Sequence, residues 1–187
     1  MLILASNSPR RKEILSMLGF EFEVLVSDCD ETTYNLTPKE TVMELAKRKA
    51  LAINAGANDV VIGSDTVVSI DNMILGKPKN ADDAKRMLHL LSGNCHEVYT
   101  GVAIISKEKT IIDFVSAKVY FNEMSKEDID YYVSTLEPMD KAGSYAVQGK
   151  GAAYIEKIEG DFFTVMGLPA SFVSNKLKEF GIYPKTK

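Results

Sequence analysis

The sequence is poor in several residue types that particular classes of protein require. Its 187 residues include two cysteines, two histidines and no tryptophan. Neither Cys29 nor Cys95 belongs to a CxxC pair, so we expect no disulfide framework and no thiolate zinc site, and we interpret both cysteines as packing residues. With only His89 and His96, a histidine-rich zinc site is excluded. A metal ion here would be held mainly by carboxylate and water oxygens, which favours magnesium or manganese.

Long apolar runs and an excess of positive charge are also missing. No stretch approaches ~20 consecutive apolar residues and no basic leader precedes the first strand-like segment, so we expect neither a membrane span nor secretion. A cytoplasmic protein is the simplest expectation. The formal net charge of −4 provides no general attraction for a polyanion. We therefore do not expect a nucleic-acid polymer as a partner.

Three common catalytic or nucleotide-binding motifs are absent. The chain contains no GxSxG nucleophile motif and no GxxxxGK[ST] phosphate-binding loop. The segment QGKGAA at 148–153 lacks the third glycine of a dinucleotide-binding fingerprint. These absences argue against a nucleophilic-triad hydrolase, a P-loop enzyme and a dinucleotide-binding enzyme of the usual type.

Strand-like and helix-like segments alternate along the chain. Capping residues, apolar periodicity and β-branched runs predict strands at 2–5, 20–27 and 60–70, a hairpin within 98–120, and helices at about 9–18, 37–55, 81–91, 125–136 and 169–181. No repeat or low-complexity linker interrupts the pattern. We predict one α/β domain spanning 1–187, with a mixed, elongated sheet flanked by helices, divided into two lobes with a ligand cleft between them.

Two cationic residues lie where helix periodicity predicts burial. Lys49 falls on the apolar stripe of the second helix, and Arg11 shares a face with Ile14 and Leu15 in the first. Lys49 could be a snorkelling lysine, and Arg10 and Arg11 a solvated surface pair. Because the helix start at Pro9 also offers free backbone N–H groups, an anion site is the other interpretation, and phosphate is its natural ligand.

Serines and acidic residues complete the set of candidates. Ser6 and Ser8 could act as helix caps, but their hydroxyls also suit phosphate oxygens. Asp65 places a carboxylate between two apolar strand segments, either satisfied by backbone donors or acting as a metal ligand or general base. The acidic run at 28–31 could be plain loop or could supply Glu31 as a second carboxylate. Several cations, few carboxylates and almost no histidine favour a magnesium-bound polyphosphate site.

Seven segments of the sequence resemble the Maf family of nucleotide pyrophosphatases, in that family's order and over nearly the whole chain. They are ASNSPRR, LAKRKA, GSDTVV, GKP, LSGNCHEVYTGV, DKAGSYAVQGKGAAYIEKIEGD and VMGLP. The resemblance implies a fold related to inosine triphosphate pyrophosphatases and hydrolysis of a nucleoside triphosphate to monophosphate and pyrophosphate with a divalent metal. It also implies phosphate-handling roles for Ser6, Arg11, Lys49 and Lys77. For Lys77 the resemblance implies a role in catalysis as well. Asp65 matches a proton acceptor and Glu31 an acidic position needed for activity; both could ligate the metal.

The branch of the family can be argued from three positions. Members that resemble 7-methyl-GTP pyrophosphatases carry Trp, Gln and Glu where this chain has Arg10, Thr66 and Gln148. A cationic purine favours stacking and a negative charge, whereas a glutamine offers the neutral donor and acceptor that suit a uracil or thymine edge. The pattern resembles the dTTP/UTP branch, with modified pyrimidine nucleotides as further substrates. A housecleaning role that prevents incorporation of aberrant nucleotides follows from this resemblance.

Two other functions remain open from the sequence. The same pocket could bind a triphosphate without turnover in a regulator of cell division or septum formation, or could belong to a purine-directed pyrophosphatase acting on ITP or 7-methyl-GTP. Gln148 by itself would be an ordinary surface-turn residue. The oligomeric state is also open, with a homodimer among the options.

Overall fold

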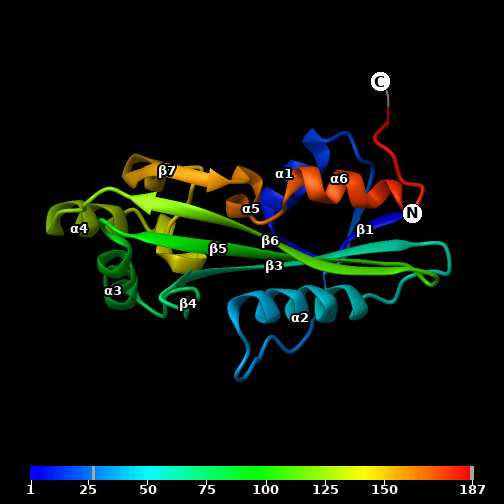
Figure 1. Ribbon diagram of the computed structural model, residues 1–187, viewed down its shortest axis with the longest axis horizontal. Helices are drawn as coiled ribbons and strands as arrows, with labels where there is room; N and C mark the ends of the chain where they lie inside the picture. Colours follow the sequence, from blue (N-terminus) through cyan, green and yellow to red (C-terminus); the bar gives the residue numbers. More distant parts are fainter. Residues whose placement is uncertain (27, 186–187) are drawn as a thin grey trace. The chain divides into compact units, whose positions relative to one another are not determined.

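The computed structural model describes residues 1–26 and 28–185, and its helices and strands alternate along much of the chain (Figure 1). The strands are β1 Leu2–Leu4, β2 Glu23–Val24, β3 Val60–Ile70, β4 Met73–Leu75, β5 Cys95–Ile105, β6 Thr110–Phe121 and β7 Ile155–Gly160. The α-helices are α1 Pro9–Met17, α2 Pro38–Leu51, α3 Ala81–Leu91, α4 Lys126–Ser134, α5 Phe162–Met166 and α6 Ala170–Lys178. The described residues also form the 3₁₀ helices η1 Glu137–Asp140, η2 Ala142–Ser144 and η3 Lys150–Tyr154.

The strands of the described residues form one mixed sheet in the order β2-β1-β3-β5-β6-β7, with β4 paired to β3. Strand β1 is parallel to both β2 and β3, whereas the β3–β4 and β6–β7 pairs are antiparallel. Asp71 and Asn72, which join β3 to β4, both have positive φ angles of 49° and 62°. Aspartate and asparagine tolerate that region better than most residues, which explains the tight turn at this point.

Residue contacts divide the chain into two compact units. Unit 1 comprises Met1–Asp65, Thr100–Val115 and Gly167–Lys187, and unit 2 comprises Thr66–Tyr99 and Ser116–Met166. The boundaries at 65/66, 99/100 and 115/116 fall inside β3, β5 and β6, so each of these strands contributes to both units. Each unit is described below by itself.

In unit 1, helix α2 lies on one side of the sheet, and α1 and α6 lie on the other (Figure 1). Two glycines allow α2 to approach the strands closely. A Cβ atom added at Gly63 of β3 would lie 2.1 Å from the carbonyl oxygen of Ala46, and one at Gly101 of β5 would lie 2.2 Å from that of Val42. Ala46 and Ala50 pack with Ile3, Val61 and Ala103 in the core. Small residues on both elements therefore set the distance between helix and sheet.

Unit 2 gathers α3, α4, η1 and η2, which contact one another, and it includes β4 and β7. Its core contains an aromatic cluster in which His96, Phe121 and Tyr145 meet edge to face at 4.9–5.3 Å between ring centroids. His96 is only 2% exposed. Helix α4 begins with a full capping box between Ser125 and Asp128, which fixes its N-terminus.

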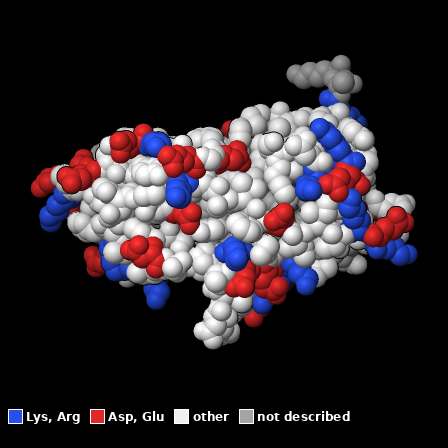
Figure 2. Space-filling view, viewed as in Figure 1, with Lys and Arg blue, Asp and Glu red and all other residues white. Residues whose placement is uncertain are grey.

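Charged side chains are distributed singly and in small groups on the face drawn in Figure 2, where basic and acidic residues of the described chain are intermixed. Many are paired, including Lys85 with Asp130 at 2.5 Å and Lys109 with Glu179 at 2.6 Å. Exposed pairs of this kind contribute about 0–1 kcal/mol each. The stability of the fold therefore depends chiefly on its apolar core.

Most of the predicted elements are confirmed, with two corrections to their length. The helix predicted to about residue 55 ends at Leu51, and beyond it Gly56 N donates to Asp59 Oδ2 at 2.7 Å in a turn. The strand predicted at 20–27 is confirmed only at Glu23–Val24, and Ser27 lies outside the described residues. Its parallel partner β1 has three residues, and Leu25 and Val26 are exposed beyond it. Burial follows the alternation from Phe20 to Val24 and ends at Leu25.

The remaining differences concern short segments and a cysteine. Strand β4, and β7 and α5 within the glycine-rich residues 143–167, are elements that the sequence patterns do not predict. Cys95 is exposed, so its interpretation as a packing residue is wrong, while Cys29 is partly buried and both thiols are free. Among the described residues, no helix combines the length and apolar character that a membrane crossing requires.

Candidate active site

Lys49 of α2 joins the two carboxylates that the sequence singles out. Its Nζ atom lies 2.6 Å from Asp65 Oδ1 and 3.1 Å from Glu31 Oε1. The side chains of Lys49 and Asp65 are only 13% and 11% exposed, whereas that of Glu31 is 60% exposed. Lys49 is therefore not a snorkelling lysine. It is a nearly buried cation whose charge is balanced by a buried carboxylate of β3.

The local sequence explains why these groups meet. Thr37 and Glu40 form a capping box, and Pro38 occupies the first turn, so the start of α2 is fixed. Lys49, eleven residues after Pro38, lies on the face of α2 that packs against β3, next to the buried Ala50. Asp65 belongs to β3, whose residues are almost all buried. An unpaired carboxylate at this position would be costly, and Lys49 supplies its partner.

Arg11 and Ser6 form a second polar group in unit 1, at the start of α1. Arg11 Nη1 donates to Ser6 Oγ at 3.0 Å, and Ser8 N donates to the same oxygen at 3.2 Å. Arg11 Nε donates to the carbonyl oxygen of Gly167 at 2.8 Å. Burial lowers the pKa of Arg11, and the nearby charge of Asp65 partly offsets that effect. The inward orientation predicted for Arg11 is thus confirmed, and its guanidinium is held from two sides.

Ser64 supports the same arrangement from the strand. It is fully buried, and its Oγ donates to the carbonyl oxygen of Gly167 at 3.0 Å. That carbonyl therefore accepts hydrogen bonds from both Arg11 and Ser64. Gly167 has a φ of 105°, a conformation that L side chains rarely adopt. The glycine of the VMGLP segment thus lets a backbone carbonyl orient Arg11.

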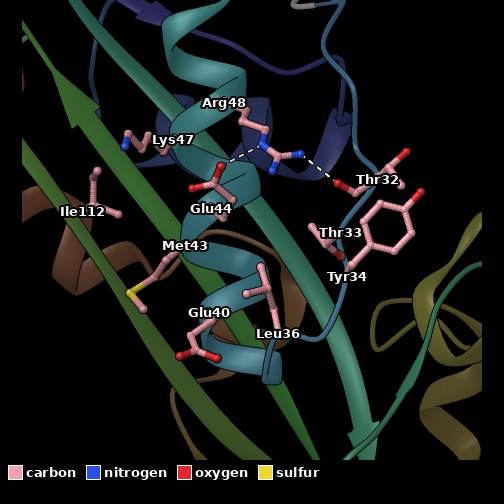
Figure 3. A pocket seen from close by; sticks show the side chains of 10 residues that line it. All are labelled: Thr32, Thr33, Tyr34, Leu36, Glu40, Met43, Glu44, Lys47, Arg48 and Ile112. Carbon is pink, nitrogen blue, oxygen red and sulfur yellow. Dashed lines mark hydrogen bonds and ion pairs between the residues drawn. The ribbon is translucent and has the colours of Figure 1, made fainter.

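The loop that carries Glu31 is held by Arg48, the neighbour of Lys49 on α2. Arg48 Nη1 donates to the carbonyl oxygens of Asp30 at 3.1 Å and Thr32 at 2.8 Å, on either side of Glu31. Its Nε donates to Glu44 Oε1 at 2.8 Å. Figure 3 shows Glu44, Arg48 and Thr32 joined in this way. Consecutive residues of α2 thus bind the Glu31 side chain and the backbone that flanks it.

A surface groove of about 630 Å³ lies beside this loop (Figure 3). Its lining includes Tyr34, Leu36, Met43, Arg48 and Ile112. Lys49, Asp65 and Arg11 do not line it. The groove is therefore a separate surface feature from the cluster of Lys49, Asp65 and Arg11.

The remaining candidates lie elsewhere in the chain. Arg10 is partly buried, on α1 in unit 1. Thr66, Lys77 and Gln148 belong to unit 2, where Thr66 is partly buried and Lys77 and Gln148 are exposed. Unit 1 therefore brings together Ser6, Arg11, Glu31, Lys49 and Asp65, and the roles of all the candidates stay predictions.

Sequence reasoning missed three residues of this arrangement, namely Ser64, Gly167 and Arg48. Ser64 and Gly167 are 103 residues apart, and Arg11 and Gly167 are 156 apart, so no local periodicity links them. The available signal was their position inside the segments GSDTVV, VMGLP and LAKRKA, next to residues that had been singled out.

Comparison with known proteins identifies the family of this chain. The sequence profile of the family described as "Maf-like protein" matches residues 1–180. The chain belongs to the Maf family. Maf relatives from Bacillus cereus strain G9842 and from Bacillus anthracis, both named dTTP/UTP pyrophosphatase, are 50% identical to it over 184 residues, covering 97% of this chain and 96% of each relative.

Solved structures similar to this Maf chain include two Ham1 proteins. The Staphylococcus aureus protein matches with a TM-score of 0.51 and 14% identity, and the Coxiella burnetii protein with 0.54 and 15%. Each match covers 95% of this chain and 98% of the other. At such low identity the likeness establishes the fold alone, and it confirms the predicted α/β class with a mixed sheet flanked by helices.

A divalent metal ion, implied by the Maf resemblance, fits the chemistry around Lys49. Glu31 and Asp65 each bring a carboxylate oxygen to the same Nζ atom, so both acidic groups reach one point. Magnesium is commonly held by one or two carboxylates, with phosphate oxygens and water completing its ligands. Within residues 1–26 and 28–185, no group of three or more His, Cys, Asp or Glu residues forms a ready-made metal site. Glu31 and Asp65 are the residues that would hold the ion.

Proposed function

We propose that this Maf protein hydrolyses dTTP and UTP to the nucleoside monophosphate and pyrophosphate. The observation that carries the proposal is the buried Lys49–Asp65 pair, with Glu31 on the same amino group and the Arg11–Ser6 pair in the same unit. Cations and carboxylates at such close quarters suit a triphosphate and its hydrolysis. The 50% identity to relatives named dTTP/UTP pyrophosphatase supports this substrate class.

In the proposed reaction, Asp65 acts as the general base. It accepts a proton from a water molecule, the water oxygen forms a bond to the α-phosphorus, and the bond from that phosphorus to the bridging oxygen breaks, so that pyrophosphate leaves. Ser6, Arg11 and Lys49 bind the phosphate oxygens, and Lys77 neutralises charge that develops on the leaving group. Glu31 would hold a magnesium or manganese ion, joined by Asp65 in the alternative in which Asp65 is a metal ligand and not the base, and the bound ion would neutralise further phosphate charge.

In the same proposal, the nucleobase of the substrate is recognised by Arg10, Thr66 and Gln148. The amide of Gln148 offers one donor and one acceptor, which matches the pairing edge of uracil or thymine without requiring a charge. The family profile matches residues 1–180, which supports a single Maf-like domain as the working unit. Removal of aberrant pyrimidine nucleotides in the cytoplasm is the physiological role that follows from this substrate class.

A substrate panel tests the proposal. The purified protein is incubated with magnesium and, separately, dTTP, UTP, ITP and 7-methyl-GTP, and nucleoside monophosphate and pyrophosphate are quantified. We expect both products from dTTP and UTP, with kcat/KM values well above those for the two purine nucleotides. Preferential turnover of ITP or 7-methyl-GTP would identify a purine-directed enzyme. Binding of dTTP without products would identify a nucleotide-binding regulator.

A further inference from the structure

A buried tyrosine and a carboxylate in unit 2 hold both ends of the segment that contains Gln148. Tyr132 of α4 is fully buried, and its hydroxyl oxygen accepts a hydrogen bond from Ala146 N at 3.0 Å. The same hydroxyl donates to Glu137 Oε1 at 2.8 Å. Ala146 precedes Gln148 by two residues, so this contact fixes the chain just before it.

Glu137 fixes the chain just after Gln148. Its Oε2 accepts from Lys150 N at 3.0 Å, and its Oε1 accepts from Gly151 N at 3.0 Å. Burial alone would raise the pKa of Glu137, but the two backbone donors and the Tyr132 hydroxyl outweigh that effect, so its pKa lies below the ordinary value. The carboxylate therefore stays ionised and keeps accepting these hydrogen bonds at neutral pH.

The backbone around Gln148 is shaped for these contacts. A Cβ atom at Gly149 would lie 2.5 Å from Glu137 Oε2, and one at Gly151 would lie 2.5 Å from the Tyr132 hydroxyl oxygen. Leu136, just before Glu137, has a φ of 63° although it is not glycine, and this turn leads the chain from the end of α4 into η1. Such a conformation persists only where the surroundings determine it.

We propose that Tyr132 and Glu137 are positioning residues that hold Gln148 in the orientation needed to read a pyrimidine base. This inference rests on the proposed dTTP/UTP pyrophosphatase function. It adds to that function the residues that support Gln148. Gln148 is exposed, while the groups that hold its backbone are part of the core or bonded to it. Residues that support metal ligands change affinity or activity about 10- to 100-fold when they are replaced, and we expect the supports of a base-reading residue to act on the same scale.

The test compares Glu137→Gln and Tyr132→Phe with the wild-type protein. Glutamine keeps the shape of Glu137 but presents an amide NH₂ to one of the backbone donors, and phenylalanine keeps the buried ring of Tyr132. Asp128→Asn is the matched control, because Asp128 is also a carboxylate of unit 2 that accepts a backbone N–H, from Ser125 at 2.9 Å. It belongs to the capping box of α4 and not to the 146–151 segment.

Three quantities are measured for each variant: kcat and KM for dTTP and UTP, and the inhibition constant of inorganic tripolyphosphate, which has no base. For Glu137→Gln and Tyr132→Phe we expect KM for both nucleotides to rise about 10-fold or more. Because tripolyphosphate has no base, its inhibition constant should stay within about twofold of the wild-type value. A purely structural loss would instead weaken the binding of both ligands alike. The Asp128→Asn variant should keep wild-type values in all three.

Each outcome decides the inference. If the variants keep the wild-type KM, or lose dTTP and tripolyphosphate binding in equal measure, the positioning role is overturned while the proposed function stands. A wild-type protein that does not hydrolyse dTTP or UTP overturns both. Should Glu137→Gln fail to fold, Tyr132→Phe alone provides the same comparison, because it removes one oxygen and leaves the packing of the ring unchanged.

Discussion

Lys49 Nζ lies 2.6 Å from Asp65 Oδ1, and both side chains are nearly buried. The pair has two consequences for the proposed site. It keeps a carboxylate inside unit 1 without an uncompensated charge, and it keeps a cation next to the group that we propose as the base. Triphosphate oxygens would then compete with Asp65 for Lys49 when substrate binds.

Replacement of Asp65 by asparagine should abolish most of the turnover but not the fold. Asparagine fills the same volume, and Glu31 still balances the charge of Lys49, so the far-ultraviolet circular dichroism spectrum should be unchanged. We expect kcat for dTTP to fall about 10²- to 10⁴-fold, the usual contribution of a general base. Asp59→Asn is the control, since it removes another carboxylate of unit 1, one paired with the N-terminal amine at 3.1 Å. A near-normal kcat in Asp65→Asn would disprove the assignment.

Arg48 should matter for catalysis more than for stability. Replacing it with methionine removes the donors that hold the backbone on either side of Glu31 but keeps the apolar part of the side chain. We expect kcat to fall about 10-fold, the lower end of the range for residues that orient a functional group. Arg86→Met is the matched control, because Arg86 is a helix-surface arginine that pairs with Asp83 at 2.8 Å in unit 2. Equal kcat values in the two variants would contradict the role assigned to Arg48.

The close packing of α2 on the sheet predicts a large effect from single methyl groups. Gly63→Ala and Gly101→Ala would each place a Cβ atom within 2.2 Å of a carbonyl oxygen of α2. Overpacking of this kind costs about 1–3 kcal/mol and sometimes more, so urea denaturation should show both variants to be destabilised by at least about 2 kcal/mol. Gly76→Ala is the control, since nothing lies within 4 Å of its added Cβ. Similar midpoints for all three variants would show that α2 packs less closely than described.

Because His96 is buried, we expect the protein to lose stability in mild acid. Burial lowers the pKa of His96 to about 4, from an ordinary value of 6.5, and its Nδ1 atom has no hydrogen-bond partner among the described residues. As the pH falls, the unfolded chain therefore takes up this proton before the folded chain does. The contribution of His96 to stability is complete above pH 6.5 and decreases by up to about 1.4 kcal/mol per pH unit between 6.5 and 4.

Denaturation curves at several pH values test this assignment. His96→Gln should have a shallower loss of stability between pH 6.5 and 4 than the wild type, whereas His89→Gln, which changes an exposed histidine of α3, should follow the wild type. If all three proteins lose stability with the same slope, groups other than His96 determine the acid sensitivity.

Local sequence signals predicted much of the fold because they act over a few residues. The capping box at Thr37 and Glu40 gave the start of α2, and helix periodicity identified Lys49 as a charge on an apolar face. The predicted length of the strand at 20–27 was wrong, because the extent of a strand depends on its partner. Its partner β1 contributes only three residues. No pattern within 20–27 contains that information.

The supports of the candidate site could not be predicted for a related reason. Arg48 binds carbonyl groups 16 and 18 residues away, and Glu137 binds backbone donors 13 and 14 residues away. Backbone donors and acceptors are the same at every position, so the sequence does not distinguish which of them a side chain will meet. Charged residues in apolar segments are visible in a sequence, whereas the partners that hold them are visible only in the folded chain.

Hydrolysis of dTTP in water labelled with oxygen-18 tests the central claim most directly. The account predicts attack of water on the α-phosphorus, so mass spectrometry should find one labelled oxygen in dTMP and none in pyrophosphate. Label in pyrophosphate would place the attack on the β-phosphorus, and release of orthophosphate would indicate cleavage at the γ-phosphorus. Either result would contradict the proposed hydrolysis by attack of water on the α-phosphorus.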